Sequence, residues 1–346
     1  YTRKNKVTKK SVSDVYKIIG YSTISTSNLY PFTIERSRFL MSEESKIGMI
    51  IPNSAFANSS MEALQDFFRS EFDYNYISTF HQRPAQLFEG VLQRLCIFIS
   101  TPKKDSQKES EFITTDIIRW TSGTRSKLFE GLKYINSPQD KQQNLINIGI
   151  ELEGSIFNKF SKHERISRYL IKSNSSNKIY YRTAGGGYWV TILNTQFDSE
   201  SLSNKSSTFQ DQYNSKVFSA VLNSSLFWWY YCINFDLFNF KDYMMFGFFF
   251  SYPEQDNKLV ELSDLLEESL QKNASYYTIN SVTRGANETV TYNKDLTKPL
   301  MDQIDTVLAK HYGFTEAELD FIINYDIKYR MGKALFGEEE NEEDED

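Results

Sequence analysis

The sequence predicts an α/β fold, in which a sheet comes first, a domain of mixed strands and helices follows, and helices end the chain. Three observations support this prediction. Helical and strand-like patterns alternate between residues 29 and 100. The composition changes after residue 171, and two helical patterns with clear end signals lie between residues 298 and 325.

The first third of the chain carries the alternating patterns. Residues 29–40 place apolar side chains at three- and four-residue spacings, which predicts a helix. The run KIGMIIP at 46–52 is short, apolar and ended by a proline, so we expect a strand buried on both faces of a parallel sheet. A second helix with a serine cap is expected over 59–72. Two more strands, joined by a loop, are expected at 74–80 and 94–100.

The rest of the chain mixes loops, strands and helices. Residues 101–111 are polar and predict a surface connection, and 151–171 predict a linking helix. Residues 172–215 are rich in Ser, Asn, Gly and Tyr, which predicts strands with long loops. Gly313 separates the last two helices, and Thr315 with Glu318 predicts a capping box. The further helices are expected over 215–231, 257–272, 298–312 and 315–325.

Composition indicates a folded, soluble, cytoplasmic protein that is long enough for two domains. At 346 residues and 40% hydrophobic content, the chain can bury a sizeable core. Its longest apolar runs, 226–233 and 244–250, fall short of the roughly 20 residues of a membrane-spanning helix. The two cysteines, Cys96 and Cys232, lie in apolar segments, so we expect buried reduced thiols and no metal site.

Charge is unevenly distributed. The net charge is −6, but the last ten residues, 337–346, hold eight carboxylates, so the remainder carries +2. We expect these ten residues to be a disordered, solvated tail. The first ten residues carry Arg3, Lys4 and Lys6 with two further lysines and no acid. Such a segment suits phosphate contact, or is an ordinary solvated loop.

Several segments, taken in order, resemble the DNA adenine-N6 methyltransferases of type II, type IIG-like, restriction–modification systems. YKIIGYSTISTSNLYPFTIERSRFL at 16–40 and KIGMIIPNSAF at 46–56 are similar to the segments that come after the catalytic Asn-Pro-Pro-Tyr motif in that family. FHQRPAQLFEGVLQRLCIFIS at 80–100 resembles its aromatic loop and the strand behind it. KIYYRTAGGGYWVTILN at 178–194 and VLNSSLFWWYY at 221–231 resemble parts of its target-recognition domain, and 298–330 resembles its helical ending.

The resemblance implies the C-terminal portion of such an enzyme. The family's Asn-Pro-Pro-Tyr motif does not occur in this sequence, and neither does the glycine-rich turn that binds the methyl donor. It implies an incomplete Rossmann-like methyltransferase sheet over 1–110, followed by an α+β target-recognition domain and C-terminal helices. The expected boundaries are a linker region at 111–171, the DNA target-recognition domain at 172–295, a helical pair at 296–336 and the acidic tail at 337–346.

Two aromatic residues are the implied catalytic residues. The spacing of the resemblance puts Tyr1 at or near the tyrosine of the catalytic motif, so the sequence would begin inside the active site. Tyr1 would stack on a flipped adenine, and Phe88 would close the pocket. The alternative for Phe88 is a core residue under a loop. The histidines His81, His163 and His311 are too scattered for a metal cluster and are expected to be structural.

DNA reading is expected in the second half of the chain. Lys, Arg and Tyr side chains contact phosphates and base edges, and glycines at 185–187 would allow close approach. Tyr180 and Trp189 can instead alternate into a strand core, and 227–231 favours helix packing over base stacking. With Arg3, Lys4 and Lys6, the candidate DNA contacts are Lys178, Tyr180, Tyr181, Arg182 and Lys205.

Three hypotheses of function arise from these patterns. The first is a part of an S-adenosylmethionine-dependent adenine methyltransferase, inactive in isolation and completed by an N-terminal half in the same or a partner chain. The second is a non-catalytic DNA-specificity subunit, and the third is an inactive remnant of a disrupted gene. Duplex DNA is the expected partner, and any endonuclease domain would lie outside this sequence.

Overall fold

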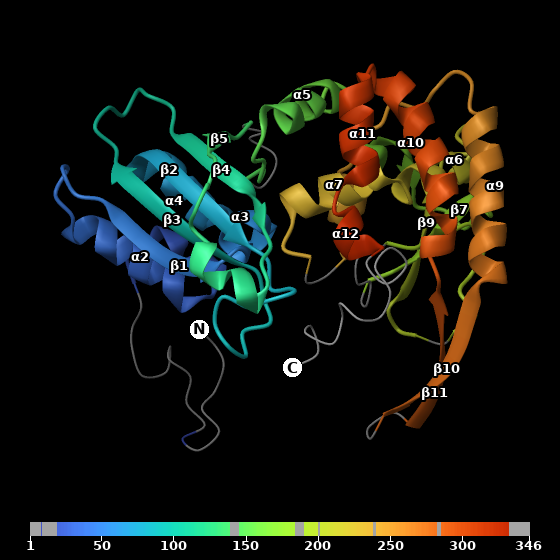
Figure 1. The fold of residues 1–346 in the computed structure, drawn as a ribbon, viewed down its shortest axis with the longest axis horizontal. Helices are drawn as coiled ribbons and strands as arrows, with labels where there is room; N and C mark the ends of the chain where they lie inside the picture. Colours follow the sequence, from blue (N-terminus) through green and yellow to red (C-terminus); the bar gives the residue numbers. More distant parts are fainter. Residues whose placement is uncertain are drawn as a thin grey trace. The chain divides into compact units, whose positions relative to one another are not determined.

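The structure is a computed structural model that describes residues 8, 19–138, 145–183, 190–199, 201–237, 240–281 and 285–331; residues 277, 279–281 and 285–289 are described by backbone alone. The chain divides into two compact units (Figure 1). The first runs up to Gly154 and includes Ile233–Asp236, and the second contains the rest. Over the described residues, none of the helices is long and apolar enough to cross a membrane.

The first unit is built on a five-stranded mixed sheet in the order β1-β3-β2-β4-β5. β3 is antiparallel to both β1 and β2, β4 is parallel to β2, and β5 is antiparallel to β4. This sheet, with the helices around it, confirms the α/β class. The strands are β1 (Ile47–Pro52), β2 (Phe72–Phe80), β3 (Leu95–Pro102), β4 (Glu111–Ile118) and β5 (Ile135–Asn136).

The position predicted for the first strand is wrong. β1 lies at the edge of the sheet, pairs antiparallel with β3, and is covered on one face. Ile47 and Ile51 are buried in the core, whereas the side chain of Ile50 is 46% exposed. An unbroken apolar run suggests burial on both faces, but side chains alternate along a strand and only one face meets the helices.

The helices of the first unit cover this buried face. α2 (Leu29–Leu40) has the predicted bounds, and the short α3 (Ser54–Ala57) follows β1. α4 (Glu62–Glu71) lies against the sheet (Figure 1), where Phe68 packs on Phe72 and Phe98. The predicted serine cap is wrong, because Asn58 accepts the hydrogen bond from the Ser60 amide at the start of the preceding 3₁₀ turn.

The predicted linker region contributes to both units. Residues 111–118 form β4, which pairs with β2 inside the first sheet. The linking helix expected over 151–171 ends at residue 160, as α5 (Glu151–Phe160), and is followed by a 3₁₀ turn (Ile166–Tyr169) and β6 (Leu170–Ile171). The division between the units falls after Gly154, within the region expected to be a linker.

The second unit contains a small sheet and a two-stranded ribbon. β6 pairs with β9 (Asn204–Phe209), which pairs with β7 (Lys178–Arg182), which pairs with β8 (Ile192–Leu193); all are antiparallel. The ribbon of β10 (Ala274–Ser281) and β11 (Gly285–Tyr292) extends away from the helices of its unit (Figure 1).

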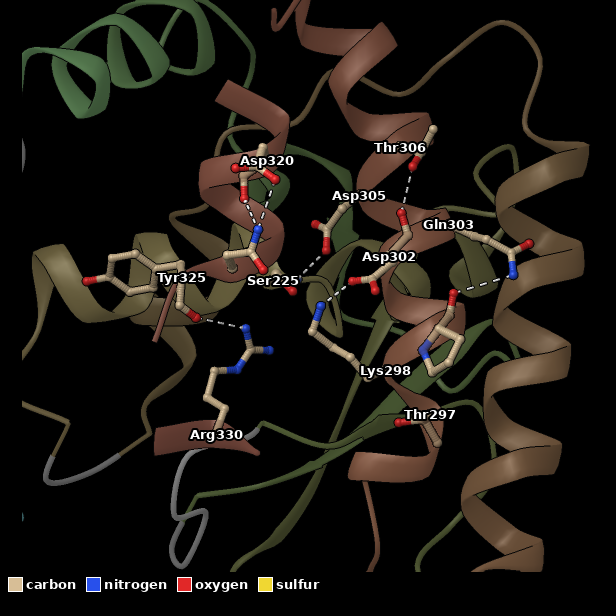
Figure 2. Close-up of polar contacts among 12 residues, drawn as sticks. Ser225, Thr297, Lys298, Asp302, Gln303, Asp305, Thr306, Asp320, Tyr325 and Arg330 are labelled. Carbon is tan, nitrogen blue, oxygen red and sulfur yellow. Dashed lines mark hydrogen bonds and ion pairs between the residues drawn. The ribbon is translucent and has the colours of Figure 1, made fainter. Parts of the chain in front are cut away.

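Aromatic helices form the core of the second unit. The helix expected over 215–231 is two helices, α6 (Ser215–Leu222) and α7 (Ser225–Asn234), joined at Asn223. α6 ends before Asn223, whose side chain exchanges hydrogen bonds with the backbone of Ile192. The Asp305 carboxylate accepts from the amides of Ser225 and Leu226 and so caps α7 (Figure 2). The rings at 227–231 are buried packing, as expected.

The last helices follow the predicted pattern. α9 (Asn257–Lys272) and α10 (Lys298–Tyr312) have the predicted bounds, and Gly313 ends α10 at φ 69°. Thr315 and Glu318 form the predicted capping box of α11 (Glu316–Asn324). Glu318 also accepts from Lys159 and Ser155 of α5, both at 2.6 Å. The remaining helices are α8 (Asp242–Phe246) and α12 (Ile327–Arg330).

Candidate nucleic-acid interface

The loop that carries Phe88 joins β2 to β3 at one end of the first sheet. Leu87 is buried in a cluster with Phe80, Leu95, Trp120 and Leu128, whereas the side chain of Phe88 is 48% exposed. The alternative that Phe88 is a core residue is therefore wrong, because the neighbouring Leu87 fills the core position. A half-exposed ring on an anchored loop is available to a ligand.

Arginine side chains hold this loop in place. The Arg125 guanidinium donates to the carbonyl oxygens of Gln86 at 3.2 Å and of Leu87 at 3.0 Å. His81, at the start of the loop, is buried and accepts at Nδ1 from the Arg83 amide. Its burial, together with the positive charge of Arg94 nearby, holds the pKa of His81 well below its usual value. The imidazole is therefore neutral and structural, as expected.

Four of the candidate residues fall outside the described residues. They are Tyr1, Arg3, Lys4 and Lys6, so their predicted contacts stay predictions. The same holds for Trp189 and for the glycines at 185–187. The acidic segment at 337–346 also lies outside the described residues.

The candidate DNA contacts on β7 lie on two opposite faces of the strand. Burial alternates along the strand, so that Ile179 and Tyr181 face the core while Lys178, Tyr180 and Arg182 face outward. Because Tyr180 is only partly buried, the alternative that it fills the strand core is wrong. Lys178 and Tyr180 are the two side chains of this strand that a ligand can reach.

Tyr181 is not available for DNA contact. Its side chain is 1% exposed, and its hydroxyl donates to the Asp242 carboxylate at 3.0 Å. Burial raises the pKa of Tyr181, so the phenol stays protonated. Lys205 lies opposite Tyr181 on β9 and pairs with the same carboxylate at 3.4 Å, with half of its side chain exposed. Lys205 therefore stays a candidate DNA contact, whereas the predicted DNA contact of Tyr181 is wrong.

Arg182 braces the second unit internally. Its guanidinium donates to Asn204 Oδ1 at 3.2 Å, to the Val290 carbonyl at 2.8 Å and to Ser199 Oγ at 2.9 Å. It also lies over the Phe197 ring, 4.6 Å from its centre. These contacts join β7 to β9 and β11, so the primary role of Arg182 is structural.

A polar pocket opens beside Lys178 in the second unit. Its volume is about 490 Å³, and it lies at the start of α6, where Asn214 caps the helix. Its lining offers both donors and acceptors, including the carboxyl groups of Asp211 and Asp256. No sequence pattern pointed to this pocket, because its residues are spread over eighty positions. They include Asn177, Lys178, Asn194, Asn214, Lys216 and Tyr252.

Two of the three histidines come together, contrary to the expectation that they are scattered. The rings of His163 and His311 are 4.8 Å apart, and both contact Tyr312. In the part of the chain that the structure describes, no three His, Cys, Asp or Glu side chains are arranged to hold a metal ion. Cys96 and Cys232 are buried thiols outside any disulfide of the described residues, as predicted.

Comparison with known proteins gives weak similarities. No family model and no curated protein matches the chain. One similar structure is the ATP-dependent Type ISP restriction-modification enzyme LlaBIII bound to DNA, 11% identical with a TM-score of 0.35; the match covers 77% of this chain and 29% of that one. Another is a nuclease-deletion mutant of the Type ISP enzyme LlaGI in complex with a DNA substrate mimic, also 11% identical with a TM-score of 0.35, covering 76% and 40%. This chain therefore spans less than half the length of either structure.

Proposed function

We propose that this chain is the C-terminal portion of a site-specific DNA methyltransferase that transfers a methyl group from S-adenosylmethionine to adenine N6 in duplex DNA. The first unit would supply part of the base pocket, and the second unit would read the DNA. One observation carries the proposal: β1, β3 and β2 are neighbouring strands of one sheet, and the loop between β2 and β3 holds Phe88 half-exposed at its end.

The sheet supports an extension at β1. Within the described residues, β1 pairs with β3 alone, so its other edge is open. α2 precedes β1 and contacts it. A strand placed before α2 would reach this open edge by a right-handed crossover, the usual connection between parallel strands. The N-terminal half of the enzyme would join the sheet at this edge of β1, and it would supply most of the contacts to S-adenosylmethionine.

The chemistry of the reaction explains why an exposed ring matters. The N6 amine of adenine is a poor nucleophile, because its lone pair is delocalised into the ring. Inside a duplex the methyl donor cannot reach this amine, so the base must first leave the stack. Extrusion costs a few kcal/mol, and an aromatic face in the pocket offsets part of that cost. Phe88 offers such a face, and the bonds from Arg125 to Gln86 and Leu87 fix its loop in advance.

DNA contact by the second unit would involve the outward face of β7. Lys178 carries a cation beside the polar pocket, and Tyr180 offers a ring on the same face. Lysine contributes mainly phosphate attraction, and polar groups of the pocket lining that are not already bonded within the protein can exchange hydrogen bonds with base edges. Lys205 would add a phosphate contact from the other face of the sheet.

In the first step of the test, this chain is used to select the duplexes that it binds from a pool of DNA with random sequence. We expect enrichment of a defined sequence, with an affinity that falls steeply as salt rises. Addition of labelled methyl donor should label such DNA only when the donor-binding half is also supplied. No labelling with or without that half would contradict the proposal.

The second candidate is a DNA-specificity subunit without catalysis. It is favoured by the second unit, which has its own buried core and its own candidate contacts. Selective binding of DNA, with no methyl transfer in the presence of the donor-binding half, would identify this function instead.

A further inference from the structure

The segment that follows β4 packs against the Phe88 loop. Residues 119–133 and 81–94 come from different connections of the first sheet, but backbone hydrogen bonds join them. The His81 amide donates to the Ile118 carbonyl at 2.9 Å, and the Ala85 amide donates to the Trp120 carbonyl at 3.1 Å. Buried Leu87, Trp120 and Leu128 seal the contact between the two segments. They therefore form one surface, which we call the loop-end surface.

The loop-end surface is basic. Its two segments contain six Arg and Lys residues, of which Arg94 is buried, and two acids, Glu89 and Glu130. The side chains of Arg83, Arg125, Lys127 and Lys133 are exposed. Within the described residues, none of these four cations forms an ion pair. Exposed cations without a carboxylate partner are suited to bind phosphates.

An exposed aromatic ring lies within this basic surface. Phe129 is 61% exposed, and its ring makes an edge contact with Phe80, at 6.0 Å between ring centres. It follows Lys127 by two residues, and Arg125 of the same segment reaches the backbone next to Phe88. An aromatic face among cations suits nucleic acid, because every base can stack on such a face while its phosphate meets a charge.

We propose that residues 119–133 form a second DNA-contact surface, which binds the strand on either side of an extruded base. Lys127 and the remaining N–H groups of Arg125 would contact phosphates, and Phe129 would stack on an unpaired base. This inference rests on the proposed function, since it takes DNA as the substrate. It assigns a binding role to a segment that the sequence presented as a linker.

The exposed cations of the loop-end surface favour a DNA strand over a protein as its partner. A protein partner of ordinary composition would bury Phe129 and gain little from the four exposed cations of the same surface. A DNA strand satisfies both features, because its backbone is a line of negative charges and an extruded base leaves its neighbours partly unstacked.

The test measures binding of the whole chain to two duplexes by fluorescence anisotropy over a range of salt concentrations. One duplex is fully paired, and the other is identical except for one mismatched base pair. We expect Lys127→Gln to reduce the slope of log affinity against log salt by about 0.9 on both duplexes. Phe129→Leu should leave that slope unchanged and reduce the preference for the mismatched duplex by about fivefold or more.

Lys104→Gln is the matched control, because Lys104 follows β3 at the opposite end of the same sheet and is exposed. It should change neither quantity. Wild-type binding by both Lys127→Gln and Phe129→Leu would overturn the inference and leave the proposed function standing. A chain that binds neither duplex would overturn both, provided that its thermal unfolding shows a folded protein.

Discussion

The guanidinium of Arg182 lies 4.6 Å from the centre of the Phe197 ring, and the two side chains come from different parts of the second unit. The same guanidinium donates three hydrogen bonds, to Ser199, Asn204 and the backbone of Val290. An arginine in a region that reads DNA is easily taken for a phosphate contact. Here it holds β7, β9 and β11 together, and that role predicts how its substitution will behave.

Replacement of Arg182 should destabilise the second unit. Arg182→Ala removes three charge-assisted hydrogen bonds, although Ser199 Oγ keeps a donor in the Asn204 amide, so we expect a loss of about 2–3 kcal/mol in unfolding free energy. Denaturant unfolding measures this directly. Lys178→Ala, on the same face of β7, should change stability by less than about 0.5 kcal/mol. Equal effects of the two variants would contradict the structural role of Arg182.

Lys178 should instead affect DNA binding. Loss of one phosphate contact reduces the salt slope of duplex binding by about 0.9, and we expect that change for Lys178→Ala. Filter binding at several salt concentrations gives the slope. Tyr181→Phe is the control, because its ring stays buried and only its hydroxyl is lost. A Lys178→Ala slope equal to that of the wild type would exclude a phosphate contact.

Phe88 should matter for methyl transfer and little for stability. Because its ring is half-exposed, Phe88→Ala should lower the unfolding free energy by less than about 1 kcal/mol. Methyl transfer by the completed enzyme should fall at least about tenfold, since a stacking face worth about 1–3 kcal/mol is lost. Leu87→Ala provides the contrast: its buried side chain predicts a loss of about 2–4 kcal/mol in stability. Unchanged methyl transfer by Phe88→Ala would remove this residue from the pocket.

The histidine pair predicts a pH dependence of stability. Burial, and then the charge of His163, lower the pKa of His311 from 6.5 to about 4. The unfolded chain therefore takes up a proton at a higher pH than the folded chain does. The stabilisation is fully present above pH 6.5 and is lost as the pH falls towards 4. Because the ring is partly exposed, we expect a loss of about 1–2 kcal/mol.

His311→Gln should flatten this dependence. Asp305 has the opposite slope in the same range, because burial raises its pKa to about 6, so the comparison is between variant and wild type at each pH. Thermal unfolding between pH 4 and pH 7.5 supplies the measurement. Parallel curves for variant and wild type would show that His311 does not titrate as described.

Local signals in the sequence predicted the helices well. α2, α9 and α10 have the predicted bounds, because their apolar spacing and end residues are decided within the helix itself. The capping box of Thr315 and Glu318 is equally local. The break between α6 and α7 at Asn223 has no such local cause, because the Asn223 side-chain amide bonds to Ile192, thirty-one positions away. The edge position of β1 likewise depends on which strand pairs with it.

The candidate site was predicted in part. The loop with Phe88 was recognised, and the structure shows its ring exposed. The sequence allowed Tyr180 to alternate into the strand core, but the structure places Tyr181 on the covered face of β7. The loop-end surface was missed, although TSGTRSKLFEGLK shows cations around a phenylalanine. Its importance emerges only when β4 places this segment beside the Phe88 loop.

Mass analysis of nucleosides tests the central claim most directly. This chain, together with the donor-binding half, would be incubated with S-adenosylmethionine and duplex DNA, and the DNA would then be digested to nucleosides. We predict N6-methyldeoxyadenosine at one defined sequence, in an amount that falls when Phe88 is replaced by alanine. DNA that carries no methylated adenine after incubation with both halves would contradict the account.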